Sequence, residues 1–137
     1  MFENINYIEL IVAGVAALVL GFVWYSMTLF GKPWLKSVGF SESEMKEDTK
    51  KNAPKMFGLM FVGAVVQAYV LSILLGVFGA GDYTSGATVA FWAWLGFIAP
   101  VVLGAVLFEK RPWNYWSITA GYQLVNMIVM SAVIVSL

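Results

Sequence analysis

The side chains that could do chemistry are few in this chain, and the missing ones narrow the function first. None of the 137 residues is His or Cys, which excludes imidazole catalysis, thiolate nucleophiles, disulfides and Cys/His zinc sites. Glu9 and Glu109 fall at the edges of apolar segments and not inside them. General acid–base and nucleophilic chemistry therefore lack their usual groups. We expect a protein that is not an enzyme and has no catalytic residues, metal site or cofactor.

The remaining candidates are uncharged polar side chains set in apolar sequence. At 100° per residue, six side chains of the last apolar segment fall within an arc of roughly 100°, and these are Tyr115, Thr119, Tyr122, Gln123, Asn126 and Met130. Gln67, in an earlier segment, lies at a similar depth, roughly 14–18 Å from the inner end at 1.5 Å per residue. Because an amide in hydrocarbon needs a partner, we expect Gln67, Gln123 and Asn126 to approach one another or to line a wet cavity. Thr119 and Tyr122 complete this candidate polar centre.

The candidate polar centre has two interpretations. Its side chains could simply hydrogen-bond helices together, at about 0.6–2 kcal/mol each. Alternatively, a solute or an ion uses the stripe, which is larger than packing requires. On the second interpretation the protein is a small oligomeric transport, permeation or small-ligand-binding unit. On the first it is a structural or accessory protein that associates with another membrane complex.

These side chains must be carried by membrane-spanning helices. Hydrophobic residues make up 61% of the chain and charged residues 12%, whereas soluble domains are about 45–50% apolar and about 25% charged. This composition excludes a soluble enzyme and a nucleic-acid binder. About 20 apolar residues cross a bilayer, and we place spans at about residues 8–30, 56–79, 84–108 and 114–136. We therefore expect an all-α, polytopic, four-transmembrane-helix bundle forming a single membrane domain, residues 1–137.

The basic residues predict the orientation of the spans. All 8 Lys and Arg lie between the first and second spans or between the third and fourth. By the positive-inside rule, both basic loops face the cytoplasm and both termini lie outside. The loop of residues 31–55 should hold a short charged helix, opened by a capping box at Ser41–Glu44 and stopped at Asn52–Pro54.

Two inner helix ends carry similar sequences. Leu29–Trp34 and Leu107–Trp113 share Leu, Phe, Lys, Pro and Trp, with one inserted residue in the second. A duplicated helix hairpin, with halves 1–80 and 81–137, would explain the match. Convergence explains it equally well, since Lys and Trp recur at cytoplasmic helix ends. The candidate residues of this inner-face motif are Lys32, Trp34, Glu109, Arg111 and Trp113. We expect Glu109 to cap a helix or to pair with Lys110, Arg111 or Lys32.

Aromatic and small residues supply packing candidates. The aromatic candidates for an interface or pocket are Trp24, Tyr25, Trp92 and Trp94, where helix packing and a lining for an apolar or cationic molecule are both possible. Small residues recur every fourth position, at Ala13, Ala17 and Gly21, at Ala64, Ala68, Ser72 and Gly76, and at Gly96, Pro100 and Gly104. Such ridges build a compact bundle, and a surplus ridge favours a homo-oligomer. Pro100 should kink the third span.

Several short motifs resemble a known family. They are Trp24-Tyr25, Leu29-Phe30-Gly31-Lys32 with Trp34, Leu107-Phe108-Glu109 with Arg111 and Trp113, and Ala120-Gly121-Tyr122. Together they resemble the domain of unknown function family 1761, over essentially the whole chain. This chain has Ser26-Met27 where the family often has Gly-Pro, and Thr119 where it often has Asn. The resemblance implies a four-helix protein of the bacterial inner membrane, and it implies no reaction.

Overall fold

The computed structural model describes residues 6–26, 28–39 and 41–137. The described residues form six helices and no strand. The helices are α1 (Tyr7–Trp24), α2 (Gly31–Val38), α3 (Glu42–Val77), α4 (Tyr83–Phe97), α5 (Ala99–Leu107) and α6 (Trp113–Ser136). Within the described ranges, four helical stretches are long and apolar enough to span a membrane, namely Tyr7–Trp24, Thr49–Val77, Tyr83–Leu107 and Trp113–Ser136. The predicted all-α, four-span membrane architecture is confirmed.

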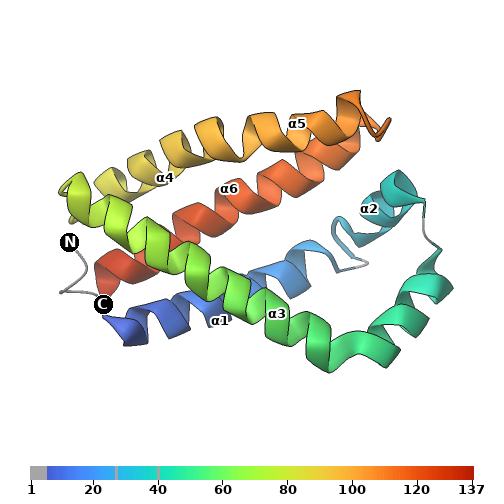
Figure 1. Cartoon of the computed structure of the whole chain (residues 1–137), viewed down its shortest axis with the longest axis horizontal. Helices are drawn as coiled ribbons and strands as arrows, with labels where there is room; N and C mark the ends of the chain where they lie inside the picture. Colours follow the sequence, from blue (N-terminus) through green and yellow to red (C-terminus); the bar gives the residue numbers. More distant parts are fainter. Residues whose placement is uncertain (1–5, 27, 40) are drawn as a thin grey trace.

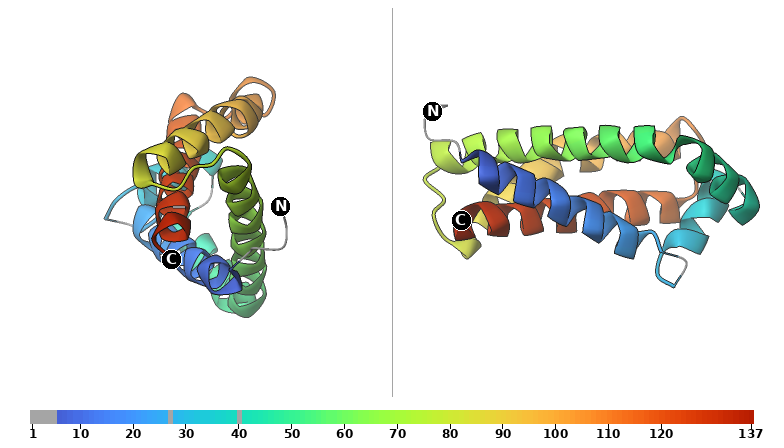
Figure 2. Two further views of the ribbon diagram at one scale, coloured as in Figure 1. Left: turned by 90° about the vertical axis from the view of Figure 1, so that its left-hand side faces the viewer. Right: turned by 90° about the horizontal axis from the view of Figure 1, so that it is seen from below.

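The long helices lie side by side along the long axis of the molecule (Figure 1). The start of α1, the end of α6 and the α3–α4 connection gather at one end, which we name the terminal end (Figures 1 and 2). The opposite end carries α2, the start of α3 and the α5–α6 connection, and therefore both basic segments. We name it the basic end. Both basic segments thus share an end, as the predicted topology requires, while the cytoplasmic orientation of that end stays a prediction.

The first span ends earlier than we expected, because a turn interrupts it. α1 stops at Trp24 and not near residue 30. The Ser26 hydroxyl donates to the Val23 carbonyl at 2.8 Å, and the Ser26 carbonyl accepts from the amides of Leu29 at 3.0 Å and Gly31 at 2.9 Å. A Cβ at Gly31 would lie 2.8 Å from the Ser26 oxygen, so only glycine fits this turn.

The basic end contains two helices where we expected one. α2 follows the turn directly and was not predicted; it ends at Gly39, whose left-handed φ of 81° suits glycine. The predicted helix start at Ser41 is confirmed, since the Ser41 hydroxyl accepts from the Glu44 amide at 3.1 Å. The predicted stop at Asn52–Pro54 is wrong: α3 continues to Val77 with Pro54 inside it. Instead of ending, α3 bends in its amino-terminal part (Figure 1), because proline removes a backbone hydrogen bond and crowds the preceding turn.

The third span is broken, as its proline predicts. α4 ends at Phe97 and α5 begins at Ala99, with Pro100 in the first turn of α5, where a missing amide proton costs least. The indole of Trp116 on α6 donates to the Ala99 carbonyl at 3.0 Å and holds the break against α6.

Small residues let the helices approach in the core. Ala13, Ala68, Ala90 and Ala120 are each 0% exposed, so two of the predicted ridges are used inside the bundle. The third ridge differs, because Gly96 and Pro100 are exposed and a Cβ at Gly96 would meet nothing within 4 Å. That ridge stays available for the predicted self-association, which remains a prediction.

Candidate functional site

The three predicted amides meet where α3 and α6 pack together. Gln67 Nε2 donates to Gln123 Oε1 at 3.1 Å, and Asn126 Nδ2 donates to Gln67 Oε1 at 3.3 Å. The expectation that these side chains approach one another is therefore confirmed. They form a continuous hydrogen-bonded chain with Gln67 in the middle.

Asn126 ends this chain with an unsatisfied atom. Its side chain is 2% exposed, and its Oδ1 has no hydrogen-bond partner in the part of the protein that the structure describes. Its Nδ2 also lies 3.9 Å from Met130 Sδ, which can only accept. Reversing all three amides would keep the chain but leave Asn126 Nδ2 unpaired instead. Either way one buried polar atom of Asn126 is unsatisfied, at a cost of about 1–3 kcal/mol.

A cleft of about 210 Å³ lies against these amides, and we name it the amide cleft. Its polar wall consists of Gln67, Tyr122, Gln123 and Asn126. Its apolar wall comes from α1 and α3, and the residues are Ala17, Leu18, Met60, Gly63 and Ala64. The cleft thus combines a hydrogen-bonding floor with apolar sides.

The amide cleft opens sideways between α1 and α3. Met60 is 52% exposed, and a Cβ at Gly63 would meet no atom within 4 Å. On the basic side, Phe22 of α1 and Phe57 of α3 touch with ring centroids 5.1 Å apart. On the terminal side, α1 and α3 come so close that a Cβ at Gly14 would lie 2.9 Å from Val65 Cγ2. The opening lies between these two contacts and therefore faces the surroundings of the spans.

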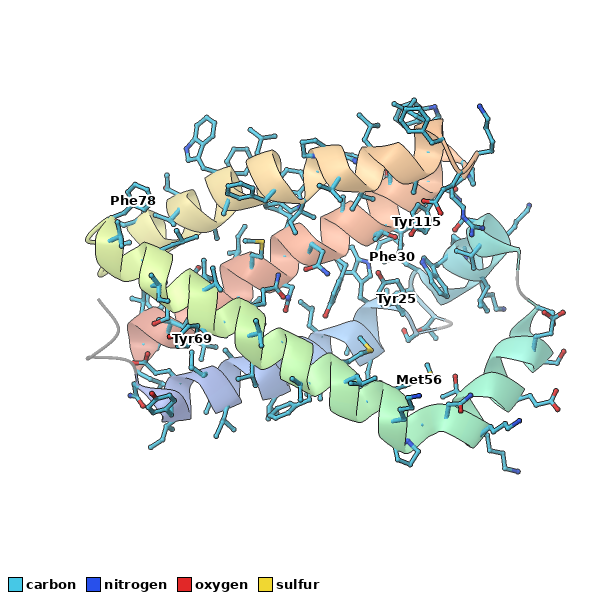
Figure 3. The ribbon with its side chains drawn as sticks, in the orientation of Figure 1. Tyr25, Phe30, Met56, Tyr69, Phe78 and Tyr115 are labelled. Atoms are coloured by element: carbon cyan, nitrogen blue, oxygen red, sulfur yellow. The ribbon has the colours of Figure 1, made fainter. Side chains whose placement is uncertain are left out.

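The other two residues of the candidate polar centre behave differently from each other. The Tyr122 hydroxyl is committed, because it donates to the Ala17 carbonyl at 3.0 Å. Thr119 Oγ1 is buried and has no hydrogen-bond partner among the described residues. The Tyr25 side chain lies near Thr119 without forming a hydrogen bond of normal geometry to it. Figure 3 shows Tyr25 in the same region as Phe30 and Tyr115, at the basic end of α6.

The indoles of Trp24 and Trp94 hydrogen-bond helices together, and no tryptophan lines the amide cleft. The Trp24 indole donates to the Ile118 carbonyl at 3.0 Å, and the Trp94 indole donates to the Ala120 carbonyl at 2.7 Å. Both bonds join another span to the backbone of α6. Trp92 is 63% exposed and points away from the bundle core. Since none of these side chains lines the amide cleft, packing is the better interpretation for Trp24 and Trp94.

Two residues of the inner-face motif contact other elements, and three are exposed. Arg111 Nη1 donates to the Val38 carbonyl at 3.0 Å, which places a cation at the carboxyl end of α2, where the helix dipole favours it. Trp34 packs edge-on against Tyr25 with centroids 5.6 Å apart. Lys32, Glu109 and Trp113 are exposed. Glu109 forms no ion pair with a described residue, so the expected pairing with Lys32, Lys110 or Arg111 does not occur. The Arg111 contact was not predicted, because it depends on α2.

The described residues contain no group of three or more His, Cys, Asp or Glu that could hold a metal ion.

The model of a family described as "Protein of unknown function (DUF1761)" matches residues 8–135. No curated protein matches the chain, and no solved structure matches it. The polar residues that line the amide cleft are uncharged, so the chemistry available there is hydrogen bonding within a membrane-spanning bundle.

Proposed function

The chain belongs to the DUF1761 family of proteins of unknown function, and we propose that it binds a small, uncharged, hydrogen-bonding molecule at the amide cleft. The observation that carries the proposal is the buried Oδ1 of Asn126, which has no hydrogen-bond partner among the described residues and belongs to a residue that lines the cleft. A buried acceptor without a partner is costly, and a hydrogen-bond donor from a bound molecule would satisfy it.

The lining of the cleft favours an uncharged molecule. Its residues include no Asp, Glu, Lys or Arg, and a charge in such surroundings would lack a counter-ion and lose its hydration. The volume of about 210 Å³ corresponds to about seven water molecules at roughly 30 Å³ each. A small polar molecule, or the polar end of a longer one, fits these limits.

The position of the opening favours binding from the bilayer over permeation through a single copy. The cleft opens between α1 and α3, whereas Leu71, Leu75 and Met130 are at most 3% exposed and fill the bundle towards the terminal end. A path along the bundle axis would have to pass this packed region. Transport therefore remains the second candidate, in an oligomer whose copies enclose the cleft.

Two measurements separate binding from transport. Purified protein in liposomes is tested for flux of ions and small neutral solutes, with Gln123→Leu beside the wild type. The binding proposal expects no flux above that of empty liposomes. Flux that the substitution abolishes would favour transport.

Single cysteines test the cleft itself, since the natural chain has none. Gly63→Cys places a thiol on the cleft wall, and Gly96→Cys places one in open space on α4. Thiols react as thiolates, which need a polar environment. We expect N-ethylmaleimide to label Gly63→Cys in membranes faster than Gly96→Cys. Benzamide, a small uncharged amide, should slow the labelling of Gly63→Cys alone. Equal rates for the two variants, unaffected by benzamide, would contradict the proposal.

We also propose that the protein resides in the inner membrane with its basic end towards the cytoplasm. The proposal rests on the 8 basic residues that share one end and on the positive-inside rule. A membrane-impermeant thiol reagent applied to intact cells stripped of their outer membrane should label Gly81→Cys at the terminal end and leave Ser43→Cys at the basic end unlabelled.

A further inference from the structure

A strained residue lies in the turn after α5, at the basic end. The Arg111 amide donates to the Ala105 carbonyl at 3.2 Å, a bond that spans the turn after α5, which itself ends at Leu107 with Phe108 as its cap. The strained residue is Lys110, with a φ of 62°, the only described non-glycine residue with a positive φ. Glycine adopts such a φ most readily, because a side chain is strained there. Strain of this kind persists where a side chain serves a function.

An apolar groove of about 470 Å³ begins beside this turn and runs between the third span and α6. Its walls come from the broken third span on one side, with Ala99, Pro100 and Leu103, and from α6 on the other, with Trp113 and Trp116. It reaches from Trp113, the first residue of α6, to Leu95, near the middle of the third span. Trp113 is 63% exposed at the mouth of the groove.

Lys110 lies three residues before Trp113 in the sequence and carries a positive charge that is available, next to the exposed carboxylate of Glu109. The only hydrogen bond of the Lys110 ammonium to the described residues is a long one, 3.4 Å to the Leu107 carbonyl, and it forms no ion pair with them. Its neighbour Arg111 is different, because it is held by the Val38 carbonyl. An exposed ammonium, an interfacial indole and an apolar groove thus follow one another from the basic end towards the middle of the bilayer.

We propose that this groove is a binding site for an anionic phospholipid, a site separate from the amide cleft. One acyl chain lies in the groove between α5 and α6. The Trp113 indole lies at the level of the ester groups, where indoles are preferred. The phosphate headgroup binds the Lys110 ammonium, and this contact accounts for a lysine at a position that suits glycine.

Quenching of tryptophan fluorescence by brominated acyl chains tests the proposal on the whole protein. The protein is reconstituted in bilayers containing brominated phosphatidylglycerol or brominated phosphatidylcholine at equal mole fraction. One lysine at an anionic surface supports a preference of about fivefold for phosphatidylglycerol. Trp113→Phe should reduce the part of the quenching that depends on headgroup to the share of Trp116, which also lines the groove. Trp92→Phe is the matched control, because Trp92 is also 63% exposed but does not line the groove, and it should retain the preference.

Substitutions of Lys110 separate the effect of its charge on lipid binding from an effect on folding. Lys110→Gly should bring the lipid preference to unity while the melting temperature stays equal or rises, since glycine suits the left-handed conformation. Lys110→Asn, which also tolerates that conformation, should do the same. Glu109→Gln should increase the preference. Equal quenching by the two lipids in the wild type, or an unchanged preference in Lys110→Gly, would overturn the proposal. Displacement by millimolar glycerol phosphate would also overturn it, because it would mean an anion site that needs no acyl chain.

Discussion

The terminal half and the basic half of the bundle are built from the same spans but are packed differently. In the terminal half, Leu71, Met130 and Ser131 are at most 2% exposed, and the Ser131 hydroxyl donates to the Ile128 carbonyl at 2.7 Å. In the basic half, which we extend to Asn126 near the middle of α6, Thr119 Oγ1 and Asn126 Oδ1 are buried and have no hydrogen-bond partner among the described residues, and the amide cleft lies beside Asn126. The terminal half is a closed core, whereas the basic half leaves two buried oxygens without a partner among the described residues.

The spacing of α1 from its neighbours explains this difference. At Gly14, α1 approaches Phe61 and Val65 of α3 so closely that a Cβ would lie 3.1 Å from the ring and 2.9 Å from the valine. One to two turns later, the Tyr122 ring lies beside Gly21, and the Tyr122 hydroxyl donates to the Ala17 carbonyl. A tyrosine between helices keeps α1 at a distance in the basic half. The close contact at Gly14 packs α1 against α3 in the terminal half, whereas the Tyr122 ring lies between α1 and α6 in the basic half.

The largest expected effect is at the core of the terminal half. Leu71→Ala should lower the free energy of unfolding by about 2–5 kcal/mol, because Leu71 is 2% exposed and a cavity would remain. Leu18→Ala on the cleft wall is the matched change and should cost clearly less, since its side chain already borders open space. Unfolding in mixed detergent micelles measures both. Equal losses would remove the distinction between the two halves.

The amide chain should show a graded response. Gln67→Leu breaks both bonds of the chain and should cost about 1–3 kcal/mol in the same unfolding assay. Asn126→Leu breaks one bond of the chain but at the same time removes the unpaired oxygen. Its net cost should therefore be below about 1 kcal/mol. If Asn126→Leu were as destabilising as Gln67→Leu, the amides would be structural and the proposed binding role would lose its support.

A comparison of two tryptophan substitutions tests whether the Trp94 hydrogen bond stabilises the packing of α4 against α6. Trp94→Phe keeps an aromatic ring but loses the 2.7 Å hydrogen bond to the Ala120 carbonyl, and it should cost about 1 kcal/mol. Trp92→Phe, at an outward position that is 63% exposed, should change stability by less than about 0.5 kcal/mol. Thermal unfolding of the two variants in one detergent measures the difference, and equal stability would mean that the indole bond contributes nothing.

The smallest effect concerns pH at the terminal end. Asp82 caps α4, and hydrogen bonds from the Ser85 side chain and from its amide, the latter 2.9 Å long, hold the pKa of Asp82 below its usual value of 3.8. A carboxylate with a lowered pKa stabilises the fold above its unfolded pKa and loses that contribution as the pH falls through the folded one. We expect a small drop in melting temperature between about pH 5 and pH 2. Asp82→Asn keeps the cap without the charge and should show a smaller drop.

Periodicity predicted the spans and the meeting of Gln67, Gln123 and Asn126, because helix geometry fixes depth and face from sequence spacing alone. The end of α1 at Trp24 and the whole of α2 could not be predicted in this way. They depend on the Ser26 turn, on the close approach at Gly31 and on Arg111, which reaches Val38 from a distant part of the sequence. The predicted stop at Pro54 is wrong because the constraints of proline fall on the turn before it, and α3 accommodates them by bending instead of ending.

The most direct test of the proposed binding role is an experimental structure in lipid nanodiscs, determined for the wild type and for Asn126→Leu. The account predicts non-protein density larger than one water in the amide cleft, within hydrogen-bond distance of Asn126 in the wild type and absent from the variant. A cleft that is closed by its own side chains, or that holds a single water in the wild type, would contradict it.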